Sequence, residues 1–277
     1  MNGKIRIQLG EVQKTLLIPL WGRARESERK KPLIVDERAR EIVSKLDYDF
    51  GAMSGQLPDQ FLINCAIRAH HFDTMLLKIL GTNPDATIVN IGAGLDTGFQ
   101  RIDNGKITWY DLDLDDSMAL RRQLIPESER NNYIAKSFFD RSWFKDIKVR
   151  GSKTIFIAGG VLVYLKEDEV KAMILDLVRE FPGSEMIFEI YSKLLFWIRR
   201  RAVAKRKGTT DLLAPFQWAA NSGKGISRWS DRIKVIDEFP FYSRVDFPED
   251  LDEKTLSQFK TINFLRMMKM VQLRLGP

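Results

Sequence analysis

Cysteine and histidine are scarce in this 277-residue sequence, and each scarcity excludes a class of site. Cys65 is the only cysteine, so no disulfide can form within the chain. The two histidines, His70 and His71, are adjacent, and neighbouring side chains on a helix do not face each other. Because no cysteine cluster accompanies them, they do not make the ligand set of a zinc site. We expect no metal centre.

Long apolar runs are also missing. No stretch approaches the roughly 20 apolar residues that a membrane helix needs. The apolar residues 16–21 are too few for the core of a signal peptide, and Glu11 and Lys14 precede them. These absences predict a cytoplasmic protein with no membrane partner.

What the sequence does have is the composition of one large globular domain, residues 1–277. Hydrophobic residues make up 44% of it, enough for a sizeable core, and charged residues make up 29%. Lysine and arginine outnumber aspartate and glutamate by 44 to 37. Part of the excess is clustered at Arg199, Arg200 and Arg201 and at residues 205–207. Such a cluster either steers an anionic partner or is a solvated helix face.

Residues 1–84 are predicted to form a helical N-terminal part. Apolar residues recur at helical spacing over 35–45, where Asp36 is a candidate N-cap. They recur again over 60–80, and Gly81 and Pro84 end that pattern.

From residue 87 onward the pattern changes to short apolar runs, with helical segments at 116–124 and 167–180 between them. Strands alternating with helices predict an α/β fold with a mostly parallel sheet and helices on both faces. Two further apolar runs near the C-terminus bring the number of expected strands to seven. The last of them suits an antiparallel strand. Residues 192–232 break the alternation and are predicted to be a helical lid insertion over the site. The seven runs are residues 87–91, 107–110, 132–135, 154–158, 185–190, 234–236 and 268–273.

A glycine turn follows the first of these runs. Gly92 and Gly94 would let the backbone turn tightly and approach a ligand closely, although a structural turn would explain them too. Asp113 lies 21 residues after Gly92, near the spacing at which an acidic residue bonds ribose hydroxyls in nucleotide-binding sheets. Thr97 stands where the third glycine of the dinucleotide fingerprint belongs, which disfavours NAD.

Three segments resemble the leucine carboxyl methyltransferase superfamily, which includes tetracenomycin-type polyketide O-methyltransferases. They are Gly-Ala-Gly-Leu-Asp-Thr at 92–97, Tyr-Asp-Leu-Asp at 110–113 and Gly-Val-Leu-Val-Tyr-Leu at 160–165. The similarity extends from about residue 15 to the C-terminus. It implies a Rossmann-like class I methyltransferase fold, S-adenosylmethionine as the cofactor, and an oxygen acceptor that is often a carboxylate.

The resemblance also implies roles for single residues. Arg68 would bind the methionine carboxylate of the cofactor, for which a planar guanidinium is suited. Asp113 would hold the ribose, with Asp111 as the alternative. Residues 136–140 match the segment that holds the adenine, where Phe138 would pack on the ring and Asp140 would accept from the amino group. The cofactor residues implied in this way are Arg68, Gly92, Gly94, Asp96, Asp111, Asp113, Ser137, Phe138, Asp140 and Gly159. The candidates for the acceptor pocket are Tyr164, Phe216 and Trp218.

The sequence departs from the family at two positions. Family members usually have arginine directly after Leu-Asp-Thr, but Gly98 stands there and Arg101 follows three residues later. Leucine carboxyl methyltransferases carry glutamate where this chain has Gly159. Both departures favour a small-molecule enzyme over a protein carboxyl methyltransferase.

The predicted function is an S-adenosylmethionine-dependent O-methyltransferase that acts on a small-molecule carboxylate or hydroxyl. A carboxylate is ionised at neutral pH and needs no base, whereas a phenol would need one. No catalytic residue can be assigned from the sequence. The alternatives are a protein carboxyl methyltransferase and a non-catalytic cofactor-binding regulatory protein. Nucleic acid is disfavoured as a partner, because no RNA-binding module and no Asn/Asp-Pro-Pro-Tyr motif is present.

Overall fold

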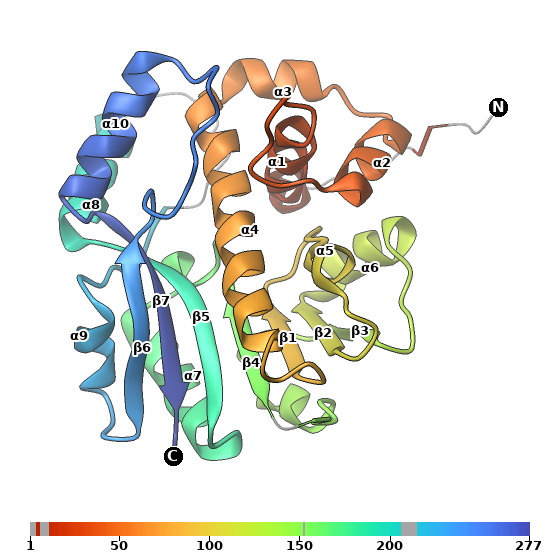
Figure 1. The fold of residues 1–277 in the computed structure, drawn as a ribbon, viewed down its shortest axis with the longest axis vertical. Helices are drawn as coiled ribbons and strands as arrows, with labels where there is room; N and C mark the ends of the chain where they lie inside the picture. The colour runs from red at the N-terminus through yellow and green to blue at the C-terminus, as the bar shows by residue number, and fades with distance from the viewer. Residues whose placement is uncertain (1–3, 6–10, 152, 206–214) are drawn as a thin grey trace.

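A seven-stranded sheet forms the centre of the molecule in this computed structural model, which describes residues 4–5, 11–151, 153–205 and 215–277. The strand order is β3-β2-β1-β4-β5-β7-β6 (Figure 1). The first five pair in parallel, and β7 is antiparallel to both of its neighbours. The predicted fold class is therefore confirmed. The strands are β1 (Thr87–Ile91), β2 (Thr108–Asp113), β3 (Asn131–Ala135), β4 (Thr154–Ala158), β5 (Ser184–Tyr191), β6 (Ile233–Pro240) and β7 (Met268–Leu275).

The order of the strands defines where a ligand can bind. The chain winds outward from β1 through β2 and β3, and then returns to place β4 on the other side of β1. This is a topological switch point, where ligands of open α/β sheets bind beyond the carboxyl ends of the strands. Every residue of β1 and β4 is buried, which explains why both read as continuous apolar runs in the sequence.

Helices cover both faces of the sheet. On one face, the apolar cluster that contains Ile88 and Ile155 also includes residues of α4 (Asp59–Leu80), α5 (Gly98–Ile102) and α10 (Glu253–Phe264). On the other face, the apolar cluster that contains Val89 and Phe156 also includes residues of α7 (Glu167–Glu180), α9 (Gly223–Ser227) and the 3-10 turn η1 (Arg141–Lys145). Helix α6 (Asp115–Leu124) contributes to a third apolar cluster that it shares with the N-terminal helices.

The N-terminal helices are α1 (Glu11–Glu26), α2 (Glu37–Lys45) and α3 (Phe50–Gln56), which gather beside α4 at one end of the molecule (Figure 1). Asp36 caps α2 by accepting the Ala39 N–H at 2.9 Å, as the sequence predicts. Helix α1 lies within the predicted helical part, although its bounds were not predicted, and Pro19 lies inside it. A side chain at Gly22 would lie 2.7 Å from the Leu62 carbonyl oxygen, so glycine permits the close packing of α1 on α4.

The segment predicted as a lid divides into two parts. Helix α8 (Lys193–Lys205) begins directly after β5, and residues 206–214 lie outside the described residues. Further on, the Trp218 N–H donates to the Val163 carbonyl at 3.2 Å, and the Ala220 N–H donates to the Tyr191 carbonyl at 3.0 Å. These bonds hold the second part against the core. No described helix is long and apolar enough to cross a membrane.

Candidate functional site

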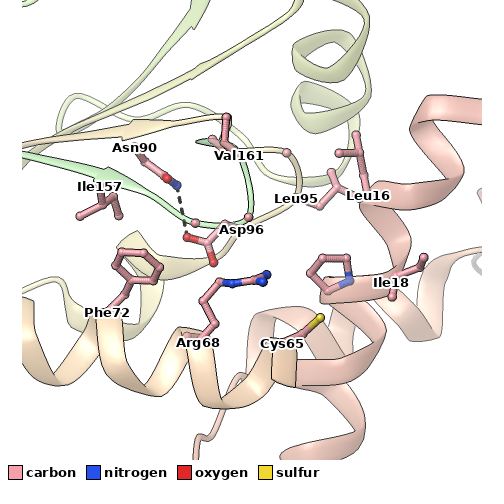
Figure 2. A pocket seen from close by; sticks show the side chains of 18 of the residues that line it. Leu16, Ile18, Cys65, Arg68, Phe72, Asn90, Leu95, Asp96, Ile157 and Val161 are labelled. Carbon is pink, nitrogen blue, oxygen red and sulfur yellow. Dashed lines mark hydrogen bonds between the residues drawn. The ribbon is translucent and has the colours of Figure 1, made fainter. Parts of the chain in front are cut away.

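A cavity of about 460 Å³ opens at the carboxyl ends of the parallel strands, at the switch point between β1 and β4 (Figure 2). Its volume falls in the range of small-molecule sites. Its walls come from α1, α4, the glycine turn after β1, the loop after β4, Arg199 on α8 and Phe216. A second hollow of about 640 Å³ between α1, the start of α4 and residues 248–250 is lined mostly by charged side chains. Of these two cavities, the first lies at the carboxyl ends of the strands.

The glycine turn needs its glycines. Gly92 and Gly94 have φ angles of 67° and 49°, the left-handed region that favours glycine. A Cβ atom on Gly92 would lie 2.2 Å from Val161 Cγ2, and one on Gly94 would lie 3.0 Å from Leu16 Cδ2. The backbone therefore forms a bare wall of the cavity at this point.

Asp113 and Asp111, two residues apart on β2, have different surroundings. Asp113 lines the cavity and accepts N–H bonds from Gly94 and Leu114, both at 2.7 Å. Burial raises the pKa of the Asp113 carboxyl. Asp111 is fully buried, pairs with Arg121 at 2.6 Å and does not line the cavity. Of the two predicted ribose acids, the structure brings only Asp113 to the site.

Replacing Asp113 with alanine is expected to weaken binding of S-adenosylhomocysteine by about 1.5–3 kcal/mol, the range for hydrogen bonds to a charged group. Calorimetric titration of the purified variant measures this loss. Asp116→Ala, which removes an exposed carboxylate from the same segment, is the control and should bind normally. Unchanged affinity in a folded Asp113→Ala protein would contradict the assignment of Asp113 to the ribose.

Arg68 extends from α4 into the cavity (Figure 2). Its Nε lies 3.1 Å from Glu189 Oε1, and its Nη2 donates to the Tyr191 hydroxyl at 3.4 Å. Burial alone would lower the pKa of Arg68, but Glu189, Tyr191 and Cys65 together outweigh it, so the pKa is raised and the guanidinium stays charged. Glu189, which the sequence analysis did not single out, is buried on β5.

Gly159 is explained by this arrangement. A Cβ atom there would lie 2.9 Å from Phe72 Cε2 and 3.3 Å from Arg68 Cδ, so a larger residue has no room. The Glu189 carboxylate instead reaches this place from the adjacent strand, where it accepts the Gly160 N–H at 2.6 Å. The chain thus has a carboxylate beside Arg68 although its sequence lacks the family glutamate.

Arg101 explains the second departure. It makes two bonds to Asp73, at 2.7 and 3.0 Å, and one to Asp36 at 3.0 Å, and it lies 3.5 Å from Asp96. A Cβ atom on Gly98 would lie 2.8 Å from Asp96 Oδ2, so position 98 is crowded. Asp96 also accepts a bond from Asn90 at 3.2 Å and lines the cavity (Figure 2). One helical turn beyond Gly98, Arg101 supplies the cation for these carboxylates.

The three predicted adenine residues follow β3, and none of them lines the cavity. Phe138 packs against the main core, Asp140 caps η1 by accepting the Ser142 N–H at 2.9 Å, and Ser137 accepts the Phe139 N–H at 3.2 Å. The role of these three residues in holding adenine stays a prediction.

The far end of the cavity is aromatic and basic. Tyr164 and Phe216 line it, with ring centroids 5.7 Å apart, and the Arg199 guanidinium lies 4.4 Å over the Phe216 ring. Trp218 does not reach the cavity. It is 3% exposed and packs against Phe188 in the core, because the backbone bond to Val163 turns this segment inward.

The family can now be identified from comparison with known proteins. The model of the family described as leucine carboxyl methyltransferase matches residues 17–178. The chain belongs to this family. It is 29% identical over 184 residues to the tetracenomycin polyketide synthesis O-methyltransferase TcmP of Streptomyces glaucescens, covering 66% of this chain and 67% of that protein. It is also 29% identical over 201 residues to the S-adenosyl-L-methionine-dependent methyltransferase dpfgK of Gibberella zeae, covering 68% of this chain and 67% of that protein.

Among solved structures, a DUF574 family protein from Streptomyces avermitilis matches with a TM-score of 0.60. The alignment covers 95% of this chain and 97% of the other at 11% identity, so it shows the fold alone. The family and fold predicted from the sequence are confirmed. The protein is a methyltransferase that depends on S-adenosylmethionine, as predicted.

The cavity residues fit this cofactor. The bare glycine wall leaves room for a ligand against the backbone, and Asp113 beside it offers a carboxylate to hydroxyl groups. Arg68, which forms an ion pair with Glu189, offers its guanidinium to a carboxylate of the ligand. The donor set therefore matches a ligand with a sugar at one end and an amino acid at the other.

Proposed function

We propose that the protein transfers the methyl group of S-adenosylmethionine to an oxygen atom of a small molecule held at the aromatic end of the cavity. The observation that carries this proposal is the continuity of one cavity. The glycine turn and Asp113 line the same cavity as Tyr164, Phe216 and Arg199. Tyr191 joins the two groups, because it contacts both Arg68 and Phe216. The family supports it, as does a relative named for polyketide synthesis O-methylation.

In this mechanism the residues of the chain mainly bind and orient the reactants. Arg68 would hold the cofactor's carboxylate, and Asp113 would hold its ribose. The cofactor supplies an activated methyl group on a sulfonium, so the remaining requirement is to align the acceptor oxygen and exclude water. Apolar side chains, among them Leu16 and Val161, line the cavity and exclude water.

The titratable groups of the cavity favour an acceptor that is already ionised. Burial raises the pKa of Tyr191 to about 12 and also raises that of Tyr164, so both phenols stay protonated at neutral pH. Asp73 and Asp96 are engaged by Arg101. Since no free base faces the acceptor end among the described residues, we infer a carboxylate acceptor in preference to a phenol.

The structure weakens the argument for a non-catalytic cofactor-binding protein. That argument depends on the two departures from the family pattern, at Gly98 and Gly159. Arg101 and Glu189 supply the charged groups that these glycines lack, so the departures give no reason to expect an inactive site.

Arg199 is expected to hold the anionic group of the acceptor. Arg199→Gln should lower kcat/KM for a carboxylate acceptor by the equivalent of about 1.5–3 kcal/mol, because a charged hydrogen bond is lost. The affinity for S-adenosylhomocysteine should not change, because Arg199 lies at the acceptor end. Steady-state kinetics and calorimetry measure the two quantities.

The matched control is Arg200→Gln, which removes the same charge from the exposed side of α8. If both variants lower kcat/KM equally, the basic cluster acts only by long-range steering, and Arg199 has no special role. That steering effect would weaken in high salt.

Two assays test the proposed function. Thermal unfolding is expected to shift upward with S-adenosylhomocysteine and not with NAD. Transfer of labelled methyl from the cofactor is then measured on a panel of aromatic carboxylic acids and phenols, with carboxylic acids expected to react. Stabilisation by NAD alone, or cofactor binding with no transfer to any oxygen acceptor, would overturn the proposal.

A further inference from the structure

One corner of the molecule carries a concentration of exposed apolar side chains. Helix α8 turns Leu194, Trp197 and Ile198 outward, each between 41% and 51% exposed. Their spacing of three and four residues places them on one face of the helix, while Leu195 packs against the core. Phe264, at the end of α10, is 86% exposed, the highest value among the exposed large hydrophobic residues.

These side chains belong to one surface. The Ser192 N–H, directly before α8, donates to the Met267 carbonyl oxygen at 2.8 Å, so the start of α8 lies beside the end of α10 (Figure 1). We define the α8–α10 corner as Leu194, Trp197, Ile198, Phe264 and Leu265. Exposed hydrophobic residues that gather in this way mark a partner surface, whereas single scattered ones do not.

The same corner is positively charged. Residues 190–205 and 254–277 contain no aspartate or glutamate. Lys193, Arg200 and Arg201 are exposed on α8, and Lys260 and Arg266 are exposed at the end of α10. The Arg201 guanidinium lies 3.6 Å from the centre of the Trp197 ring, so charge and apolar surface are interleaved. A second copy of this chain would bring the same charge and be repelled, so the partner is anionic.

We propose that the α8–α10 corner docks the protein on the surface of an anionic phospholipid bilayer. The apolar side chains enter the boundary between headgroups and acyl chains, and the basic residues pair with lipid phosphates. Tryptophan is enriched at this boundary in membrane proteins. The expectation of no membrane partner rested on the lack of a spanning segment, and surface docking needs none.

Vesicle co-sedimentation tests the proposal on the full-length protein. Binding is expected to vesicles of phosphatidylcholine with phosphatidylglycerol, to weaken in high salt, and to be absent with phosphatidylcholine alone. Arg200→Gln with Arg201→Gln should weaken binding roughly 30-fold, since each basic residue near the surface contributes a factor of about five. Trp197→Ser with Phe264→Ser should weaken it at least as much.

Matched controls lie elsewhere on the surface. Lys171→Gln with Arg179→Gln on α7 removes the same charge, and Leu77→Ser on α4 removes an apolar side chain that is 53% exposed. Both controls should bind vesicles normally. Failure of the unaltered protein to bind anionic vesicles overturns the proposal whatever the variants do. Loss of binding in the charge variant but not in the apolar variant also overturns it, because the partner is then a soluble polyanion.

Discussion

Arg101→Ala is expected to lower the free energy of unfolding by about 3–5 kcal/mol, the cost of removing one partner from a buried ion pair. Arg101 is 6% exposed and contacts Asp36, Asp73 and Asp96. Without it, Arg23 remains near Asp36 and Asp96, whereas Asp73 loses its ion pair with Arg101. Urea unfolding at pH 7 measures the loss. The control is Arg40→Ala, which breaks an exposed pair with Glu37 and should cost less than about 1 kcal/mol.

The pH dependence of this loss has a defined sign. Burial alone would raise the pKa of Asp36, but Arg23 and Arg101, together with the hydrogen bonds from Thr97 and the Ala39 N–H, outweigh it, so the folded pKa is lowered. Asp36 therefore stabilises the unaltered protein above its unfolded pKa, and this contribution is lost as the pH falls. In the variant, burial without Arg101 favours protonated carboxyl groups, so acid should stabilise it relative to the unaltered protein. The difference should shrink from pH 7 to pH 4, and a constant difference would contradict this explanation.

The parts of the site that lie close together in the sequence were predictable. The turn at Gly92 and Gly94 follows a buried strand, and its left-handed φ angles are a local requirement of the backbone. Asp113 ends the next strand, and adjacent parallel strands end at the same edge of a sheet, so the spacing alone brings Asp113 to the turn.

The parts that depend on packing between distant segments were not predictable. Glu189 meets Arg68 only because β5 lies beside β4 and α4 packs over both. Trp218 was predicted to line the acceptor pocket because it is an aromatic residue of the predicted lid, but a backbone bond to Val163 turns it into the core. The sequence shows that Gly98 and Gly159 lack side chains, but it does not show which neighbours fill the space.

Helix α1 is a case in which packing overrides local preference. A proline in a helix interior costs about 3 kcal/mol, and Pro19 lies inside α1. Leu17, Leu20 and Ala24 are nearly or fully buried in the structure. Burial of large aliphatic side chains contributes about 1.5–3 kcal/mol each, which offsets the proline.

Arg68→Ala is expected to abolish measurable binding of S-adenosylhomocysteine and also to destabilise the fold. The destabilisation follows because the Glu189 side chain, 2% exposed, loses its cation and becomes an unpaired buried charge, at a cost of about 3–5 kcal/mol. Adding Glu189→Gln removes that charge. The double variant should therefore regain most of the stability without regaining binding, as a double-mutant cycle of urea unfolding would measure.

The cofactor fragment 5′-methylthioadenosine separates the binding role of Arg68 from the structural one. It lacks the amino acid part of the cofactor, so its affinity should be the same in the unaltered protein and in the double variant. Arg68→Lys should keep the charge opposite Glu189 but not restore binding of S-adenosylhomocysteine, because an ammonium cannot form the two parallel bonds of a guanidinium. If the fragment and S-adenosylhomocysteine lose affinity together in the stable double variant, Arg68 shapes the cavity as a whole. If neither loses affinity, the carboxylate of the cofactor lies elsewhere, and Arg68 serves only to neutralise Glu189.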